Sequence, residues 1–188
     1  MRKTILFTAA VLLATSVLSA RGGHFGHGRG WHNSHKNNTT LPVTQLTQQQ
    51  KDDLLFMYQE EKMARDVYIA LGEKWGSRVF LNIQKSEQAH MNAIKRLLDK
   101  YSLEAPVPNS DIGNFENEEL QALYNQLIEK GNLSLEDALE VGVAIEETDI
   151  ADLEEKIDSA TRDVARVYSR LLRGSYNHLR AFNANLGN

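Results

Sequence analysis

Apolar residues recur every three or four positions over most of the chain after about residue 47, which is the spacing of one face of an α-helix. The pattern predicts four long helices and a weaker, shorter one between the second and the third. No strand-like alternation is found, so we expect an all-α four-helix bundle with a long crossover between its second and third helices. The expected helices run from Thr47 to Gly72 or Gly76, over 79–101, from Glu118 to Lys130, from Ser134 to about 157, and over about 164–182.

Residues at the predicted helix limits support this division. Thr47 and Gln50 have the spacing of a capping box, in which each side chain bonds to the backbone of the other residue. Ser134 is a favourable N-cap followed by acidic residues in the first turn. Gly72 and Gly76 mark the end of the first helix, because glycine adopts the backbone conformation that closes a helix.

The first 20 residues have the pattern of a secretory signal peptide. Arg2 and Lys3 precede an apolar run that ends in small residues, and this run is short for a membrane span. We therefore expect export to a periplasm or to the exterior, with no membrane span after cleavage. An uncleaved membrane anchor is the alternative.

Residues 21–43 are rich in glycine, asparagine and histidine and show no periodicity, so we expect a disordered tail before a helical domain over 44–188. Flexible histidine-rich tracts can bind copper, nickel or zinc, and a solvated linker with incidental histidines is the alternative. The tail holds four of the six histidines of the chain: His24, His27, His32 and His35.

Composition narrows the possible functions. The 188 residues suffice for one domain with a hydrophobic core. The formal net charge is −4 and no basic patch is present, which argues against nucleic acid as a partner. The chain has no cysteine, so disulfides, zinc–thiolate sites and thiol catalysis are excluded.

The candidate chemistry lies on the apolar stripes of the four long helices, where each helix carries at least one metal-competent side chain. A buried carboxylate is costly unless it is paired or bound to a metal. Oxygen and imidazole donors without thiolates suit iron or manganese. The candidate ligands are Glu61; Glu87 with His90; Glu146 with Asp149; and His178.

Each of these residues taken alone has a simpler explanation. A lone histidine in a core is more often hydrogen-bonded than metal-bound, and Glu61 could pair with Arg65 one turn further on. The joint pattern favours a site for two metal ions, because two cations offset acids that would otherwise repel one another. A metal-free bundle that retains these acids as a buried polar network is the alternative.

Four segments resemble the motifs of rubrerythrin-type proteins of the ferritin-like superfamily. They are Glu61-Lys-Met-Ala-Arg-Asp-Val-Tyr68, Glu87-Gln-Ala-His90, Glu146-Glu-Thr-Asp149 and Ser175-Tyr-Asn-His178. The resemblance implies a ferritin-like four-helix bundle over about 45–186, with a crossover between the second and third helices. It also implies metal-ligand roles for the six candidate residues, and for Tyr68 a hydrogen bond to one of the ligands.

One position departs from the family pattern. The last motif normally offers a glutamate where this chain has Ser175, and a hydroxyl is a poor substitute for a bridging carboxylate. Either Asp149 supplies the missing charge, or one metal position is weak or empty. Without cysteine there is no rubredoxin-like module, so a peroxidase of the rubrerythrin type would need an external reductant.

The sequence therefore predicts an exported metal-binding protein with about two irons per chain, or manganese in their place, and no organic cofactor. The implied activity is oxidation of ferrous iron or reduction of oxygen or peroxide, although the sequence does not decide whether the protein is an enzyme. A non-catalytic metal-binding envelope protein and a purely structural helical module are the alternatives. The pattern does not specify an oligomeric state.

Overall fold

The computed structural model describes residues 45–105 and 112–187. These two stretches contain five α-helices and no strand, which confirms the expected all-α class for this part of the chain. The predicted signal peptide and tail lie outside the described residues. None of the described helices is long and apolar enough to cross a membrane. The helices are α1 (Gln48–Trp75), α2 (Arg78–Lys100), α3 (Glu118–Gly131), α4 (Leu135–Ile157) and α5 (Arg162–Leu186).

Local capping explains where several helices begin. At the start of α1 the backbone N–H of Gln50 donates to Thr47 Oγ1 at 3.2 Å, and that of Thr47 donates to Gln50 Oε1 at 3.0 Å. This reciprocal pair confirms the predicted capping box. The predicted cap of α4 is also present, since Ser134 Oγ accepts from the backbone N–H of Asp137 at 3.0 Å. Such bonds satisfy N–H groups that the first turn of a helix leaves without partners.

Gly72 does not end α1, although the sequence allowed either Gly72 or Gly76 to do so. The helix continues to Trp75, and Gly76 closes it with a φ of 62°, in the left-handed region that glycine adopts without strain. Gly72 instead permits a close approach to α2. A Cβ atom at Gly72 would lie 3.2 Å from Cβ of Phe80, in the first turn of that helix.

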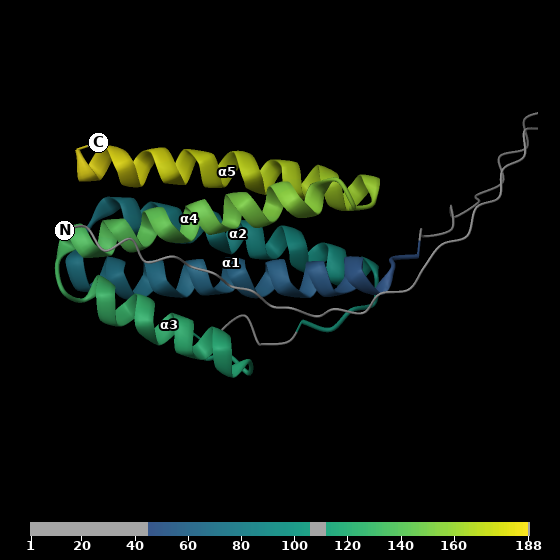
Figure 1. Cartoon of the computed structure of the whole chain (residues 1–188), viewed down its shortest axis with the longest axis horizontal. Helices are drawn as coiled ribbons and strands as arrows, with labels where there is room; N and C mark the ends of the chain where they lie inside the picture. The colour runs from purple at the N-terminus through teal and green to yellow at the C-terminus, as the bar shows by residue number, and fades with distance from the viewer. Residues whose placement is uncertain (1–44, 106–111, 188) are drawn as a thin grey trace, which may run out of the picture. The chain divides into compact units, whose positions relative to one another are not determined.

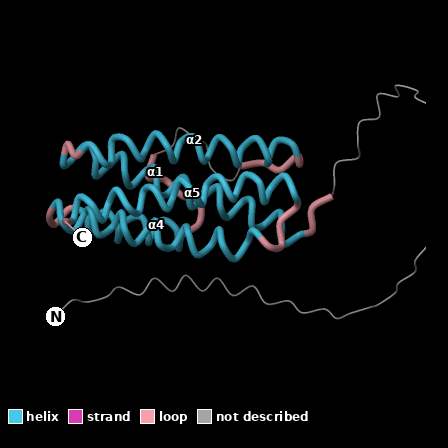
Figure 2. Tube along the Cα trace, turned by 90° about the horizontal axis from the view of Figure 1, so that it is seen from above, coloured by secondary structure: helices cyan, strands magenta, loops and turns pink. Residues whose placement is uncertain are grey.

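The four long helices lie side by side (Figures 1 and 2). Consecutive helices form two pairs, α1 with α2 and α4 with α5, and the pairs meet where α2 packs on α5 and α1 packs on α4. The shorter helix α3 lies against α1 and α4, between the second and third long helices in chain order, as expected. This arrangement turns one face of each long helix toward a common interior.

Two apolar regions fill that interior at different levels. The first is a cluster that includes Leu54, Met57, Ile94 and Leu153, which are fully buried. The second is an aromatic trio in which the ring centroids of Tyr68, Phe80 and Phe182 lie 5.2–5.9 Å apart. Along α1, α2 and α5 the candidate metal ligands fall between residues of these two regions, and on α4 they fall between Leu153 of the cluster and Gly142, which lies against Phe182. Polar side chains are therefore enclosed by apolar ones from both sides.

A second group of buried charges connects α1 to the segment before α3. We call Lys62, Arg65 and Asp66 the salt-bridge cluster. Lys62 Nζ lies 2.6 Å from Asp66 Oδ2, and Arg65 Nη2 lies 2.6 Å from Asp66 Oδ1. The backbone N–H of Gly113 donates to Asp66 Oδ2 at 2.8 Å, and Lys62 donates to the Asn114 carbonyl at 3.2 Å. The cluster therefore holds the crossover against α1.

Candidate metal centre

The structure brings the sequence-predicted ligands together in one layer between the two apolar regions. Glu61 comes from α1, Glu87 and His90 from α2, Glu146 and Asp149 from α4, and His178 from α5. Their side chains are almost fully covered; the most exposed, that of His90, retains 12% of its accessible surface. We use the name polar layer for these six residues together with Ser175.

Five of the six predicted ligands form two clusters that share one carboxylate. Glu61, Glu87 and His90 bring one ligand atom each within 4.8 Å of one another, and so do Glu87, Glu146 and His178. Glu87 Oε2 lies 2.8 Å from His90 Nδ1, whereas Glu87 Oε1 lies 2.7 Å from His178 Nδ1. The two oxygens of Glu87 thus face different clusters, as a carboxylate that bridges two metal ions does.

The two imidazoles are oriented alike. Both present Nδ1 to Glu87, and the ring centroids lie 5.5 Å apart. His178 Nε2 lies 2.9 Å from Ser86 Oγ, which holds the far side of that ring. Ser86 was not singled out from the sequence, because a small polar residue beside the apolar stripe gives no periodic signal. A partner on the second nitrogen is the usual device that orients a metal-binding histidine.

Gly174 gives the His90 ring its space. A Cβ atom at Gly174 would lie only 2.6 Å from His90 Nε2 and 2.7 Å from its Cε1. The group that fills the space beside this glycine is therefore the imidazole of a candidate ligand on α2.

Asp149 belongs to the polar layer but to neither of the two clusters found among the described residues. Its Oδ2 lies 2.5 Å from Ser175 Oγ, which is also 3.1 Å from the Leu171 carbonyl. The single hydroxyl proton of Ser175 can serve only one of these acceptors, and an ionised carboxylate is the stronger one. Ser175, where the rubrerythrin-type motif that it resembles has a glutamate, therefore holds Asp149 by a hydrogen bond.

Tyr68 belongs to the aromatic trio and contacts the polar layer through its hydroxyl group. Its hydroxyl donates to Glu146 Oε1 at 2.7 Å, so Glu146 Oε2 is left to face His178 Nδ1 at 3.4 Å. This contact agrees with the hydrogen-bonding role that the resemblance implied for Tyr68. Burial and the charge of Glu146 raise the pKa of the Tyr68 hydroxyl well above its usual value, so it remains a donor.

The centre of the layer is an ion-pair network. Burial would raise the pKa of Glu87, but the hydrogen bonds from His178 and His90 prevail and lower it to about 2. Burial alone would have the opposite effect on the two imidazoles and lower their pKa values. The charge of Glu61 and the bond to Glu87 instead raise that of His90 to about 11, and bonds to Glu146 and Glu87 raise that of His178 to about 9.

The remaining acids of the layer resist ionisation. Burial, followed by the charge of Asp149, raises the pKa of Glu61 well above its usual value. Burial and the charge of Glu87 raise that of Glu146 to about 8, and burial raises that of Asp149 to about 6 despite the Ser175 bond. The layer holds more acids than its two imidazoles can neutralise.

The residues fit a pair of hard or borderline metal ions. Buried oxygens Glu61 Oε1 and Asp149 Oδ1 have no hydrogen-bond partner within the described residues, which is costly in a protein interior. The donors are carboxylate oxygens and imidazole nitrogens, the set that suits iron and manganese. Cations between them would pair with these oxygens and offset the surplus negative charge.

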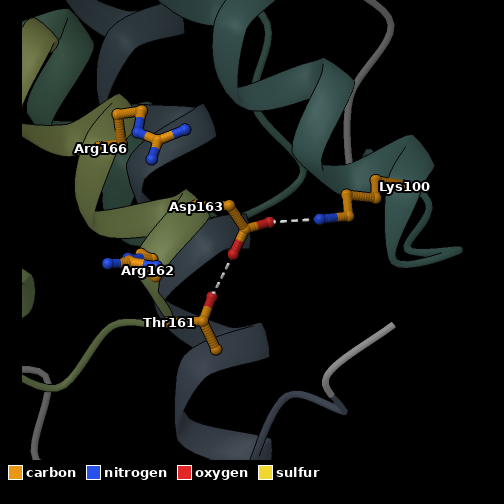
Figure 3. A pocket seen from close by; sticks show the side chains of 5 residues that line it. All are labelled: Lys100, Thr161, Arg162, Asp163 and Arg166. Atoms are coloured by element: carbon orange, nitrogen blue, oxygen red, sulfur yellow. Dashed lines mark hydrogen bonds and ion pairs between the residues drawn. The ribbon is translucent and has the colours of Figure 1, made fainter. Parts of the chain in front are cut away.

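A shallow hollow on the surface is chemically different from this interior site (Figure 3). It lies between the end of α2 and the start of α5 and is lined by Lys100, Thr161, Arg162, Asp163 and Arg166. Asp163 accepts from Lys100 at 2.6 Å and from Thr161 Oγ1 at 2.8 Å, so its carboxylate already has partners. Asp163 precedes His178 by about 20 Å along α5, so the hollow does not open onto the polar layer.

Fold and layer together define a class of protein: an all-helical chain whose long helices enclose buried carboxylates and imidazoles that could hold metal ions. The chain belongs to the family described as "Uncharacterized protein domain (DUF2202)", whose profile matches residues 50–188.

Two similar proteins have solved structures. The uncharacterized protein MJ0754 of Methanocaldococcus jannaschii is 47% identical over 151 residues, which cover 80% of this chain and 82% of the relative. Its crystal structure matches with a TM-score of 0.75 over 79% of this chain and 86% of that chain. A DUF305 fragment from Deinococcus radiodurans matches with a TM-score of 0.57 at 19% identity, over 76% of this chain and 98% of the fragment, and shows a similar fold alone.

Proposed function

We propose that the polar layer binds two metal ions, iron in the first place and manganese as the alternative, inside a four-helix bundle of the ferritin-like kind. The observation that carries the proposal is the position of Glu87, whose two oxygens face two separate ligand clusters. Glu61, Glu87 and His90 would hold one ion, and Glu87, Glu146 and His178 the other. Asp149 would complete the first position from the far side.

Electrostatics supports the same assignment. Burial, then the charges of neighbouring acids, raises the pKa values of Glu61 and Glu146, and a pair of divalent ions would offset that negative charge. The shared role of Glu87 also accommodates Ser175. Since Glu87 already faces both clusters, a second bridging carboxylate from α5 is not needed to join them.

The chain's own residues prepare this site for redox chemistry. When bound, a pair of irons would supply the oxidation of ferrous iron or the reduction of oxygen or peroxide. Tyr68 fixes Glu146, Ser86 fixes the ring of His178, and Ser175 fixes Asp149. The apolar cluster and the aromatic trio exclude water on both sides. The signal-peptide pattern of residues 1–20 favours export, where the reductant would come from a separate protein or small molecule.

The test is the metal content per chain after anaerobic reconstitution with ferrous iron, measured by plasma mass spectrometry. We expect about two ions per chain. Glu87→Ala combined with His90→Ala should abolish binding to the layer and leave a helical protein. Glu147→Ala, at an exposed acid of α4, is the control and should bind as the wild type does. Stoichiometric retention of metal by the double variant would refute the proposal.

A non-catalytic metal-holding role is the second candidate, and Ser175 favours it, because the carboxylate that rubrerythrin-type proteins normally offer there is missing. The two roles differ in one reaction. Ferrous iron added to the reconstituted protein in air should be oxidised faster than by the double variant if the site is redox-active, and at the same rate if it only holds metal. Deleting residues 21–43 shows in the same assay whether the histidine-rich tail contributes to loading.

A further inference from the structure

Glu60 lies beside Glu61 on α1 but faces α4 rather than the two ligand clusters. Two contacts fix the register of these helices: Lys156 Nζ lies 4.9 Å from the ring centroid of Phe56, and the Tyr68 hydroxyl lies 3.4 Å from the Gly142 carbonyl. Residues of α1 and α4 between these contacts face one another in reverse order. Glu60 therefore stands at the level of Asp152 and Asp149.

These three carboxyl groups are close enough to perturb one another. Burial, then the charges of Asp152 and Asp149, raise the pKa of Glu60 well above its usual value. After burial, the charge of Asp149 contributes most to the raised pKa of Glu61. Asp149 and Asp152 are also three positions apart on α4, so their side chains lie on the same face of that helix, at the level of Glu60. The acids thus follow one another from Asp152 to Glu61.

Polar atoms without partners lie along the same line. Glu60 Oε2, Asp149 Oδ1 and the hydroxyl of Tyr168 are buried and have no hydrogen-bond partner in the part of the chain that the structure describes. Tyr168, from α5, is 1% exposed, and burial, then the charges of Asp53 and Glu60, raises the pKa of its hydroxyl. Buried polar atoms of this kind call for water or an ion.

Exposure falls steadily along this line of acids. The side chain of Asp152 is 22% exposed, whereas Asp149 is 9% and Glu61 is 2% exposed. At the outer end Lys156 Nζ lies 2.9 Å from Asp152 Oδ1, so an ammonium group occupies the place that an incoming cation would take. The line therefore connects the surface to the first ligand cluster.

We propose that Asp152, Glu60 and Asp149 form a carboxylate passage between α1 and α4 through which divalent cations reach the polar layer, with Lys156 at its outer end. The passage rests on the proposed function, since it needs a metal site at Glu61 to lead to. Each acid offers a cation a partner one step further inward. Lys156 competes for Asp152 and slows admission.

The test separates the rate of metal uptake from the final amount bound. The full chain is mixed with Co²⁺ alone, and the absorbance of the bound ion is followed by stopped-flow spectroscopy. Glu60→Gln and Asp152→Asn should each slow uptake about tenfold, the scale on which local charge changes the association of ions, with the final content unchanged. Glu147→Gln makes the same change at an exposed site of α4 and should load at the wild-type rate.

Lys156→Gln provides a change of opposite sign, because removing the competing ammonium should accelerate uptake. The melting temperature of the metal-free variant is measured alongside, because a loosened α4 would also expose the layer. Faster uptake at an unchanged melting temperature and final content separates admission from structural damage. Equal rates for the wild type, Glu60→Gln and Asp152→Asn would overturn the passage. A lower final content at an unchanged rate would also overturn it, because Glu60 would then be a ligand.

Failure of the proposed function gives a different result. The variant with both Glu87→Ala and His90→Ala retains the histidine-rich tail and therefore reports binding outside the layer. If the wild type binds no more Co²⁺ than this double variant, the metal site itself is absent and the passage has nothing to serve. If the wild type binds more, the comparison of rates tests the passage alone.

Discussion

Two groups of buried charges begin at adjacent positions of α1 and differ in nearly every other respect. In the salt-bridge cluster, Lys62 and Asp66 are completely buried, and the cations contact both oxygens of the single acid. In the polar layer, Glu61 is 2% exposed and one of its oxygens has no hydrogen-bond partner among the described residues. The first group is internally paired, whereas the second has an excess of acids.

This difference separates a structural role from a functional one. Buried ions are tolerated when they are paired, and the salt-bridge cluster meets this condition, because both oxygens of Asp66 face a cation and further bonds join the cluster to the backbone at Gly113 and Asn114. The polar layer does not, and its acids have raised pKa values as a result. We infer that the first group stabilises the fold without any ligand, and that the second depends on one.

The largest effect should follow from breaking the salt-bridge cluster. Asp66→Ala leaves Lys62 and Arg65 without their shared acid, and we expect a loss of about 3–5 kcal/mol in the free energy of unfolding. Adding metal should not restore the free energy of unfolding of this variant to the wild-type value. The control is Asp99→Ala, which removes the exposed partner of Lys95 and should change little. Urea unfolding with and without metal measures both; a small change for Asp66→Ala would show that the cluster is not structural.

Two glycine variants should affect stability and metal binding differently. At Gly142 an added Cβ would lie 2.5 Å from Phe182 Cε1, in the aromatic trio, and at Gly174 it would meet the His90 ring. We expect Gly142→Ala to cost about 1–3 kcal/mol in the free energy of unfolding. Gly174→Ala should instead displace His90 and weaken metal binding more than it lowers the stability of the metal-free protein. Calorimetric titration with Co²⁺ and thermal unfolding distinguish the two; equal effects of both variants on binding would contradict the assignment.

Much of the polar layer was predictable, because its residues lie on apolar stripes whose period is local information. The same is true of the caps at Thr47 and Ser134, where a few neighbouring residues determine the hydrogen bonds. The salt-bridge cluster was predictable only in part. The Lys62–Asp66 pair has the local i,i+4 spacing of a helix. Its contacts with the backbone of residues 113–114, about 50 positions further along the chain, leave no trace in helical periodicity.

Gly72 illustrates the same limit within one helix. A glycine near the end of an apolar stripe is a reasonable stop signal, but the space beside Phe80 explains this one, and that depends on how α1 and α2 meet. The contact of Gly174 with His90 likewise depends on how α2 and α5 meet. Sequence periodicity thus assigns residues to a face, whereas tertiary packing decides which side chain each one touches.

The metal-free protein should become less stable as pH rises from about 5 to about 9. Folding raises the pKa of Glu146 to about 8, of Asp149 to about 6 and of His178 to about 9. Each raised group contributes stability that is present at low pH and lost as pH rises through its folded pKa. Folding lowers the pKa of Glu87 to about 2, so this group has the opposite effect on stability, but only at pH values below its ordinary pKa.

Metal should reverse this trend. The imidazoles bind metal in their neutral form, so binding releases protons and becomes stronger as pH rises. Melting temperatures measured across this range with a chelator and with saturating metal should therefore diverge toward high pH. A metal-free melting temperature that rises with pH would show that the acids of the layer are not held in the protonated state by burial.

The smallest effect should come from Ser175→Ala, which removes the hydroxyl 2.5 Å from Asp149 Oδ2. We expect a loss of about 1 kcal/mol in the free energy of unfolding, because Asp149 can take up a proton when its donor is removed. Metal affinity should fall further than stability, since the carboxylate is then neutral and no longer oriented. Ser175→Thr keeps the hydroxyl and should restore both. If Ser175→Ala binds metal as tightly as the wild type, Ser175 does not position Asp149 for the site, and the missing family glutamate has no replacement here.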